Sequence, residues 1–142
     1  MTSIQMKDNL YREKIGGVKI RTTNSNEFIN SVIFSEKFPL TINLNAQVEF
    51  FNIKPDHDYL LLIYSMSEFE HKSEVMTFIN TKREDMLFGA SNEYGKTVGY
   101  FDLNLVIDKP QDKLIYCVLM DSANLVKSLD DYYTYLTFAN KE

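Results

Sequence analysis

Two short stretches of the sequence contain side chains of the kinds that bind metal ions or transfer protons. One is residues 56–58, Asp-His-Asp, and the other is residues 68–74, which hold three glutamates and a histidine. Only two histidines and one cysteine occur in the chain, which excludes a closed structural zinc site. The two loops support one functional hypothesis, a small enzyme or a metal-dependent ligand-binding protein. Its candidate metal ligands are Asp56, His57, Asp58, Glu70 and His71.

A second stretch has the spacing of a phosphate-binding loop. Residues 90–97 end in Lys96 and Thr97, with alanine where the first glycine of such a loop normally stands. A phosphate-binding loop needs a helix directly after it, because the backbone N–H groups at the helix start face the phosphates. Here residues 98–103 alternate as a strand does. We therefore predict a glycine-containing surface loop between strands, and no nucleotide hydrolysis.

Three tyrosines on one short segment form a candidate interaction surface. If the segment is a strand, its side chains alternate between two faces, so Tyr132, Tyr133 and Tyr135 cannot all point inward. Exposed tyrosine is enriched at interfaces. Between Tyr132 and Asn140 the segment has no proline, lysine or arginine to protect an open edge. The sequence thus predicts a protein partner or self-association, as a homodimer, through this segment.

Charge is distributed unevenly along the chain. Residues 1–21 hold five basic and two acidic groups, although the formal charge of the whole chain is −5. An acidic body repels phosphate backbones, which argues against general nucleic-acid binding. The basic segment is either a solvated charged edge or a contact for an anionic partner. Its candidate interaction residues are Arg12, Lys14, Lys19 and Arg21.

The elements that must position these residues are mostly strands. Residues 40–50 alternate strictly between apolar and polar side chains, and the pair Phe50–Phe51 breaks the pattern, as a bulge does. The apolar run 59–64 is typical of a strand covered on both faces. We expect a further strand at 74–80 and a hairpin formed by 98–108 and 113–121 around a turn at 109–112.

Three segments fit more than one element. The pair Gly16–Gly17 suits a hairpin turn, but residues 3–15 also fit a short helix ended by glycine. Residues 26–37 fit a helix or a strand. Residues 122–138 have an apolar arc at helical spacing and a tyrosine-rich end; we predict a short helix over 123–129 and then a strand. The two glycine clusters, at 16–17 and 89–99, indicate positive φ or close backbone approach.

Together these patterns predict a mainly β fold, a single-domain antiparallel β-sandwich of about seven to nine strands with one or two short helical segments. Residues 1–24 would add a basic hairpin or helix to it, and 142 residues suit one domain. The longest apolar run is too short to span a membrane. The single cysteine, Cys117, and the lack of an apolar leader favour a cytoplasmic location.

Because the chain is poor in catalytic constellations, the leading functional hypothesis is a non-catalytic binding or interaction module without a cofactor. Such a module would act through a sheet face, an edge strand or loops. The enzyme alternative requires the loops at 56–58 and 68–74 to meet at one end of the sandwich.

Overall fold

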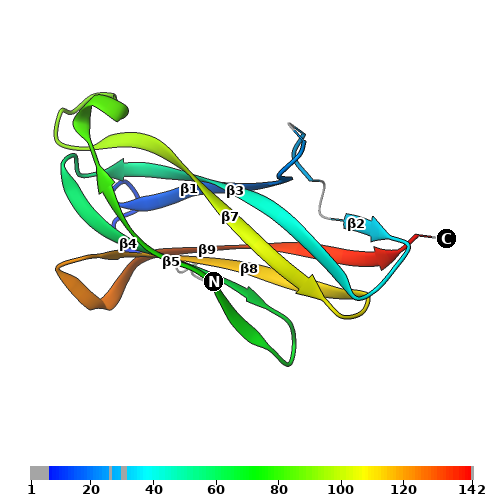
Figure 1. The fold of residues 1–142 in the computed structure, drawn as a ribbon. Helices are drawn as coiled ribbons and strands as arrows, with labels where there is room; N and C mark the ends of the chain where they lie inside the picture. The colour runs from blue at the N-terminus through cyan, green and yellow to red at the C-terminus, as the bar shows by residue number, and fades with distance from the viewer. Residues whose placement is uncertain (1–6, 26, 30–31, 142) are drawn as a thin grey trace, which may run out of the picture.

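Nearly all of the chain is β-structure. The computed structural model describes residues 7–25, 27–29 and 32–141, and within these it contains nine strands and one three-residue 3₁₀ helix, Arg83–Asp85. The strands form two sheets stacked face to face, as Figure 1 shows. In this part of the chain no helix is long and apolar enough to cross a membrane.

The two sheets are of four and five strands. The four-stranded sheet is antiparallel and has the order β1 (Lys14–Thr22), β3 (Leu40–Ile53), β7 (Gly95–Ile107) and β6 (Leu87–Phe88). The five-stranded sheet has the order β2 (Val32–Ser35), β9 (Asn124–Asn140), β8 (Gln111–Asp121), β4 (His57–Met66) and β5 (His71–Thr81). Only the β2–β9 pair within it is parallel. The predicted sandwich fold is confirmed.

The core lies between the sheets and follows the predicted alternation. In β3 the side chains of Leu44, Ala46 and Val48 are fully buried, and the polar residues between them face outward. The pairing of β3 with β7 shifts register between Phe50 and Ile53, which confirms the predicted bulge. The facing sheet contributes the inward residues of β4, β8 and β9: Tyr59, Leu61, Ile63, Ile115, Cys117, Leu119, Leu136 and Phe138.

Two local predictions are wrong. β7 and β8 do not form a hairpin, because β7 pairs with β3 and β8 pairs with β4 and β9, in different sheets. The predicted turn at 109–112 is present as a bend at residues 109–110. Such a bend does not determine with which strand the following residues pair. The helix over 123–129 is also absent: the chain turns at 122–123 and then continues as β9. Pairing with the long strand β8 overrides the helical spacing of Leu125 and Leu129.

The N-terminal segment and the glycines also differ from expectation. Gly16 and Gly17 lie inside β1, where a register shift opposite β3 replaces the expected turn. Residues 7–13 form turns and bends and no helix; residues 3–6 of the alternative helix lie outside the described residues. In the segment 26–37, residues 32–35 form β2, so the strand alternative holds there; residues 26, 30 and 31 lie outside the part of the chain that the structure describes. No glycine has a positive φ. The predicted close approach to the backbone is present at Gly99, where an added Cβ would lie 2.7 Å from the Phe101 ring.

Candidate interaction surface

The outer face of the four-stranded sheet is mostly polar. Its cross-strand neighbours include Arg21, Asn45 and Asp102, and Asn45 Nδ2 donates a hydrogen bond to Asp102 Oδ1 at 3.2 Å. One row further along, Lys19 lies 3.4 Å from the Glu49 carboxylate. β7 places three exposed apolar side chains among these polar groups: Val98, Tyr100 and Val106.

The outer face of the five-stranded sheet is, by contrast, mostly apolar. In four consecutive rows the register of β4 and β8 places apolar or tyrosine side chains side by side, and either β5 or β9 continues each row with another one. The other ends of the four rows are polar: His71, Ser73, Ser128 and Asp131. Beyond these rows, β2 adds Val32 and Phe34 beside the C-terminal end of β9. Several of these side chains are more than half exposed, among them Met76 at 70% and Phe78 at 63%. We call this surface the outer apolar face. It consists of Val32, Phe34, Leu60, Leu62, Tyr64, Met66, Met76, Phe78, Leu114, Tyr116, Val118, Met120, Tyr133 and Tyr135.

The tyrosines of β8 and β9 form the aromatic part of this face. Tyr132 packs against the core, whereas Tyr133 and Tyr135 point outward, as alternation requires. The rings of Tyr116 and Tyr133 are 6.5 Å apart and those of Tyr133 and Tyr135 are 5.9 Å apart, both edge to face. The Tyr116 hydroxyl donates to Asp131 Oδ2 at 2.7 Å. That hydrogen bond raises the pKa of Tyr116 to about 12 and lowers the pKa of Asp131.

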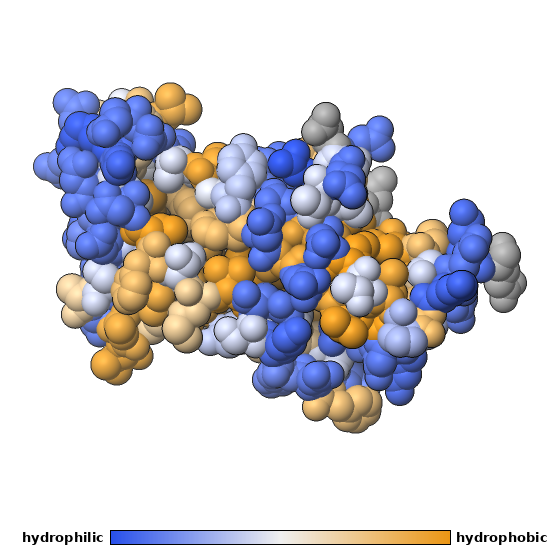
Figure 2. Space-filling model, viewed as in Figure 1, coloured by the Kyte–Doolittle hydropathy of each residue, from blue (hydrophilic) through white to orange (hydrophobic). Residues whose placement is uncertain are grey.

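Two hairpins border the outer apolar face. The β4–β5 and β8–β9 hairpins both extend beyond the sheet on the side away from the four-stranded sheet (Figure 1). Each tip carries a highly exposed apolar side chain: Phe69, which Glu68 and Glu70 flank, on the first and Val126 on the second, exposed by 93% and 96%. Figure 2 shows apolar surface at the lower left, where the β8–β9 hairpin projects. Beside Phe69 lies an open groove of about 580 Å³. Met66, Leu114 and Tyr135 line it together with charged and polar side chains: Ser67, Glu68, His71, Asp112, Lys113 and Thr137.

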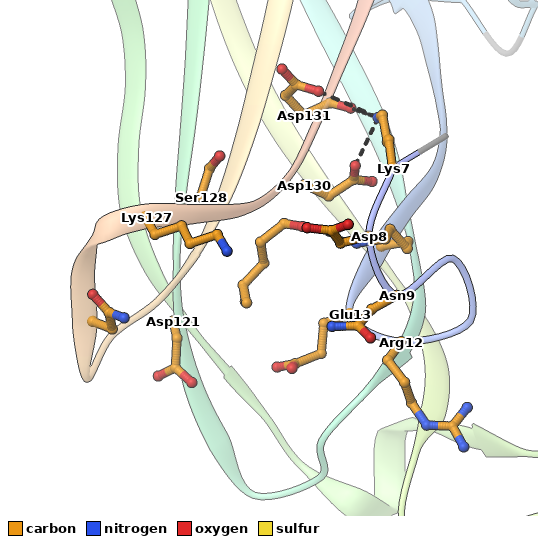
Figure 3. Close-up of a pocket in the computed structure, with 13 residues that line it drawn as sticks. Lys7, Asp8, Asn9, Arg12, Glu13, Asp121, Lys127, Ser128, Asp130 and Asp131 are labelled. Atoms are coloured by element: carbon orange, nitrogen blue, oxygen red, sulfur yellow. Dashed lines mark hydrogen bonds and ion pairs between the residues drawn. The ribbon is translucent and has the colours of Figure 1, made fainter. Parts of the chain in front are cut away.

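The basic residues near the N-terminus contact this chain's own groups. Lys7 bridges Asp130 and Asp131 at 2.7 and 3.3 Å, as Figure 3 shows. The buried Lys14 donates from Nζ to the Leu129 carbonyl oxygen at 3.0 Å. The Arg12 guanidinium lies 4.5 Å above the Tyr94 ring. Among the basic interaction candidates, only Lys19 and Arg21 lie on an outer sheet face.

An open cleft of about 390 Å³ lies between the N-terminal segment and the β8–β9 hairpin. Side chains of both signs line it, including Lys127 and Glu13, which point into the same space in Figure 3. Because positive and negative groups alternate around it, the cleft has no preference for one charge type. We assign it a structural role in holding the N-terminal segment against β9.

The candidate metal ligands are separated by the length of β4. His57 Nε2 lies 3.0 Å from Asp121 Oδ1, and Asp58 accepts a hydrogen bond from Asn80 at 2.7 Å. Glu70 and His71 lie at the opposite end of the β4–β5 hairpin, about 30 Å away at the usual rise of a strand. Within the described residues no group of three metal-ligating side chains comes together. The single pocket that the enzyme alternative required is therefore not formed by these two loops.

The phosphate-loop spacing at 90–97 has a structural explanation. Gly95 and Lys96 begin β7, so a strand follows the loop, as predicted. The Lys96 amino group lies 4.8 Å from the centre of the Phe51 ring and donates to Asn52 Oδ1 at 3.2 Å. The lysine thus stabilises the bulged end of β3.

Comparison with known proteins bears on the fold. No protein-family model matches the sequence, and none of the curated proteins matches it. Two crystal forms of a Mobiluncus mulieris adhesin that contains intramolecular disulfide, isopeptide and ester bond cross-links superpose with TM-scores of 0.64 and 0.65. They share 7% sequence identity with this chain and match 89% and 92% of it. A CARDB domain from Pyrococcus furiosus, solved with di-metal ions, matches 92% of this chain and 97% of its own at 11% identity and a TM-score of 0.49.

This chain spans little more than half of the adhesin chain, 56% and 58% in the two structures. At such low identity the likeness concerns the arrangement of strands alone. The protein has a β-sandwich fold that also occurs in a bacterial adhesin.

Proposed function

We propose that this protein is a non-catalytic binding module that holds a protein partner on the outer apolar face. The observation that carries the proposal is the difference between its two outer faces. One is mostly polar, and its exposed apolar side chains belong mostly to β7; the other presents Met76, Phe78 and Tyr133 to solvent in register with further apolar residues. Exposed apolar area of this extent marks interaction sites in soluble domains.

The composition of the face supports a protein partner. Tyrosine and methionine are enriched in the centres of protein interfaces, where large side chains contribute much of the binding energy. The Tyr116–Tyr133–Tyr135 cluster supplies rigid aromatic area, and methionines at positions 66, 76 and 120 supply side chains that adapt to a partner's shape. The adjoining groove would accept one projecting side chain.

The reactive side chains support a non-catalytic role because they are engaged in structural contacts. His57 is paired with Asp121, and Cys117 is fully buried, which raises the pKa of its thiol to about 12. A nucleophilic cysteine instead needs an accessible site that lowers its pKa.

A site-specific photocrosslinker tests the proposal. Benzoylphenylalanine is placed at Phe78, on the outer apolar face, or at Tyr100, on the polar face; the two positions are similarly exposed, by 63% and 60%. After irradiation of the cells that make the protein, we expect defined adducts from position 78 and none of comparable yield from position 100. Equal yields from both positions, or none from position 78, would contradict the proposal.

A further inference from the structure

We infer that the occupant of the outer apolar face is a second copy of this chain, packed face to face in a two-fold symmetric dimer. This inference rests on the proposed function and names its partner. It extends the self-association predicted from the tyrosines of β9 to the whole sheet face. In such a dimer the two five-stranded sheets would stack about 10 Å apart, as sheets do inside a sandwich.

The extent of the face fits a stable dimer. Four strands spaced by about 4.8 Å, and four rows of outward side chains spaced by about 6.7 Å, give a projected area on the order of 500 Å². The relief of the side chains makes the accessible area larger than this projection. A stable interface needs about 800 Å² from each partner. Two copies of the four rows amount to about 1,000 Å², the lower bound for a specific interface, and β2 and the two hairpins add to it.

The face also carries both halves of a self-complementary contact. In a two-fold interface each copy presents the same patch, so a projection and the recess that receives it must both belong to that patch. Phe69, exposed by 93%, projects from the β4–β5 hairpin directly beside the groove lined by Met66, Leu114 and Tyr135. A two-fold axis that crosses the strands near this end would place the Phe69 of each copy over the groove of the other.

The electrostatics of the face permit two acidic copies to meet. In the four rows, β4 and β8 contribute only apolar and tyrosine side chains, and the one carboxylate, Asp131 on β9, is paired with Lys7 and Tyr116. Pairing the four rows would therefore bury no uncompensated charge. The charged side chains of the groove, Glu68, Asp112 and Lys113, lie at its margin and include both signs. Repulsion between the bodies, each with a formal charge of −5, is screened by salt. We expect added salt to strengthen the dimer, whereas it would weaken binding to a basic partner.

Sedimentation of the purified full chain over a range of concentrations tests the inference. We expect a reversible dimer at micromolar concentration. Tyr133→Lys should weaken it by at least about 30-fold, the factor that corresponds to one interface contact of about 2 kcal/mol. Tyr100→Lys is the matched control, because Tyr100 and Tyr133 are exposed by 60% and 58% on opposite sheets. It should leave the dimer unchanged within about twofold. Phe69→Ser should weaken the dimer as well.

Urea unfolding of each variant checks that it is folded, and Met76→Lys replaces Tyr133→Lys if the latter is not. A wild-type chain that stays monomeric at all concentrations overturns the inference. A dimer that responds equally to Tyr133→Lys and Tyr100→Lys overturns it too. Adducts from position 78 to a different protein, together with a monomeric wild type, would refute the second copy but keep the binding function. The absence of any adduct at position 78 would refute both.

Discussion

The buried carboxylate of Asp130 accepts a hydrogen bond from the backbone N–H of Ile15 at 2.8 Å and so connects β9 to β1 across the two sheets. Its other oxygen lies 2.7 Å from the Lys7 amino group. One side chain thereby closes this side of the sandwich and holds the basic segment in place. The uneven charge distribution along the sequence has its structural explanation here.

Replacing Asp130 with alanine leaves the N–H of Ile15 without an acceptor in a buried position. We expect the free energy of unfolding to fall by about 2 kcal/mol, and by less in Asp130→Asn, which keeps an acceptor oxygen. Lys7→Ala is the control: its side chain is 52% exposed, so the loss should stay below about 1 kcal/mol. Urea unfolding curves measure all three. Equal losses for Asp130→Ala and Lys7→Ala would contradict the role assigned to the hydrogen bond.

Neighbouring positions in β3 provide a test of which side chains form the core. Leu44 is fully buried and Asn43 is exposed. Leu44→Ala should lower the free energy of unfolding by roughly 2–5 kcal/mol, because it removes buried methyl groups and leaves a cavity. Asn43→Ala should change it by no more than about 0.5 kcal/mol. The reverse order in urea unfolding would mean that β3 faces the other way.

Gly99 should resist substitution although its φ is not positive. A Cβ there would lie 2.7 Å from the Phe101 ring and 3.3 Å from the Phe50 ring, so the packed rings would have to move. We expect Gly99→Ala to cost about 1–3 kcal/mol of unfolding free energy. At Gly89 the nearest atom to an added Cβ is the flexible Lys96 Nζ, at 3.9 Å, and Gly89→Ala serves as the control. Thermal unfolding that ranks the two variants the other way would exclude this steric account.

The contact between Tyr116 and Asp131 should give the protein a measurable pH dependence. The pKa of Tyr116 is raised from 10.0 to about 12 in the folded state, mainly by its hydrogen bond to Asp131. The stability that this contact contributes is complete below pH 10, the unfolded pKa, and is lost as pH rises from about 10 to about 12. Tyrosinate absorbance should show a group titrating near pH 12 that is missing in Tyr116→Phe, whereas Tyr59, whose pKa burial also raises, titrates late in both proteins.

In Asp131→Asn that group should titrate earlier, because the carboxylate no longer disfavours the phenolate. On the acid side, the pKa of Asp131 is lowered from 3.8, so its contribution is present above that value and disappears as pH falls through the folded pKa. The stabilities of wild type and Asp131→Asn should therefore converge in acid. An unchanged difference between them would show that the contact adds nothing to stability.

Cys117 should be unreactive in the folded protein. Its side chain is fully buried in β8, and burial raises the pKa of the thiol to about 12. Ellman's reagent at neutral pH should label it only as the chain unfolds, at a rate that increases with urea. Rapid complete labelling without denaturant would contradict its place in the core.

The fold was predictable wherever side-chain period alone determines the structure. β3 was recognised because each inward residue is followed by a polar one, and its bulge because Phe50–Phe51 breaks that order. The sheet to which β8 belongs was not predictable, because a proline-containing turn can connect two strands of one sheet or two strands of different sheets. The helix expected at 123–129 was excluded only by pairing with β8, a contact that local sequence does not record.

The surface was predicted in part. Tyr133 and Tyr135 were identified because three tyrosines on a strand cannot all be buried. The rest of the outer apolar face was not predicted. A run with apolar residues on both faces, such as 59–64, is typical of a strand that is buried on both sides. Its periodicity does not show whether the layer that covers it belongs to the same chain or to a partner. Here β4 has no covering layer on its outer side within the described residues. The hydrogen bond from Lys14 to the Leu129 carbonyl oxygen could not be predicted from the sequence either, because the two residues are 115 positions apart.

The order of the strands has a consequence for how the chain folds. β4 pairs with β8, and β1 is tied to β9 through Asp130, so each sheet is completed by segments synthesised much later than the ones they join. Pairings between distant segments make folding slow, because a long loop must close before any contact forms. During synthesis β4 can pair at once with β5, but its other edge stays open until β8 has been made. We expect chaperones that hold extended apolar segments to bind the chain at this stage.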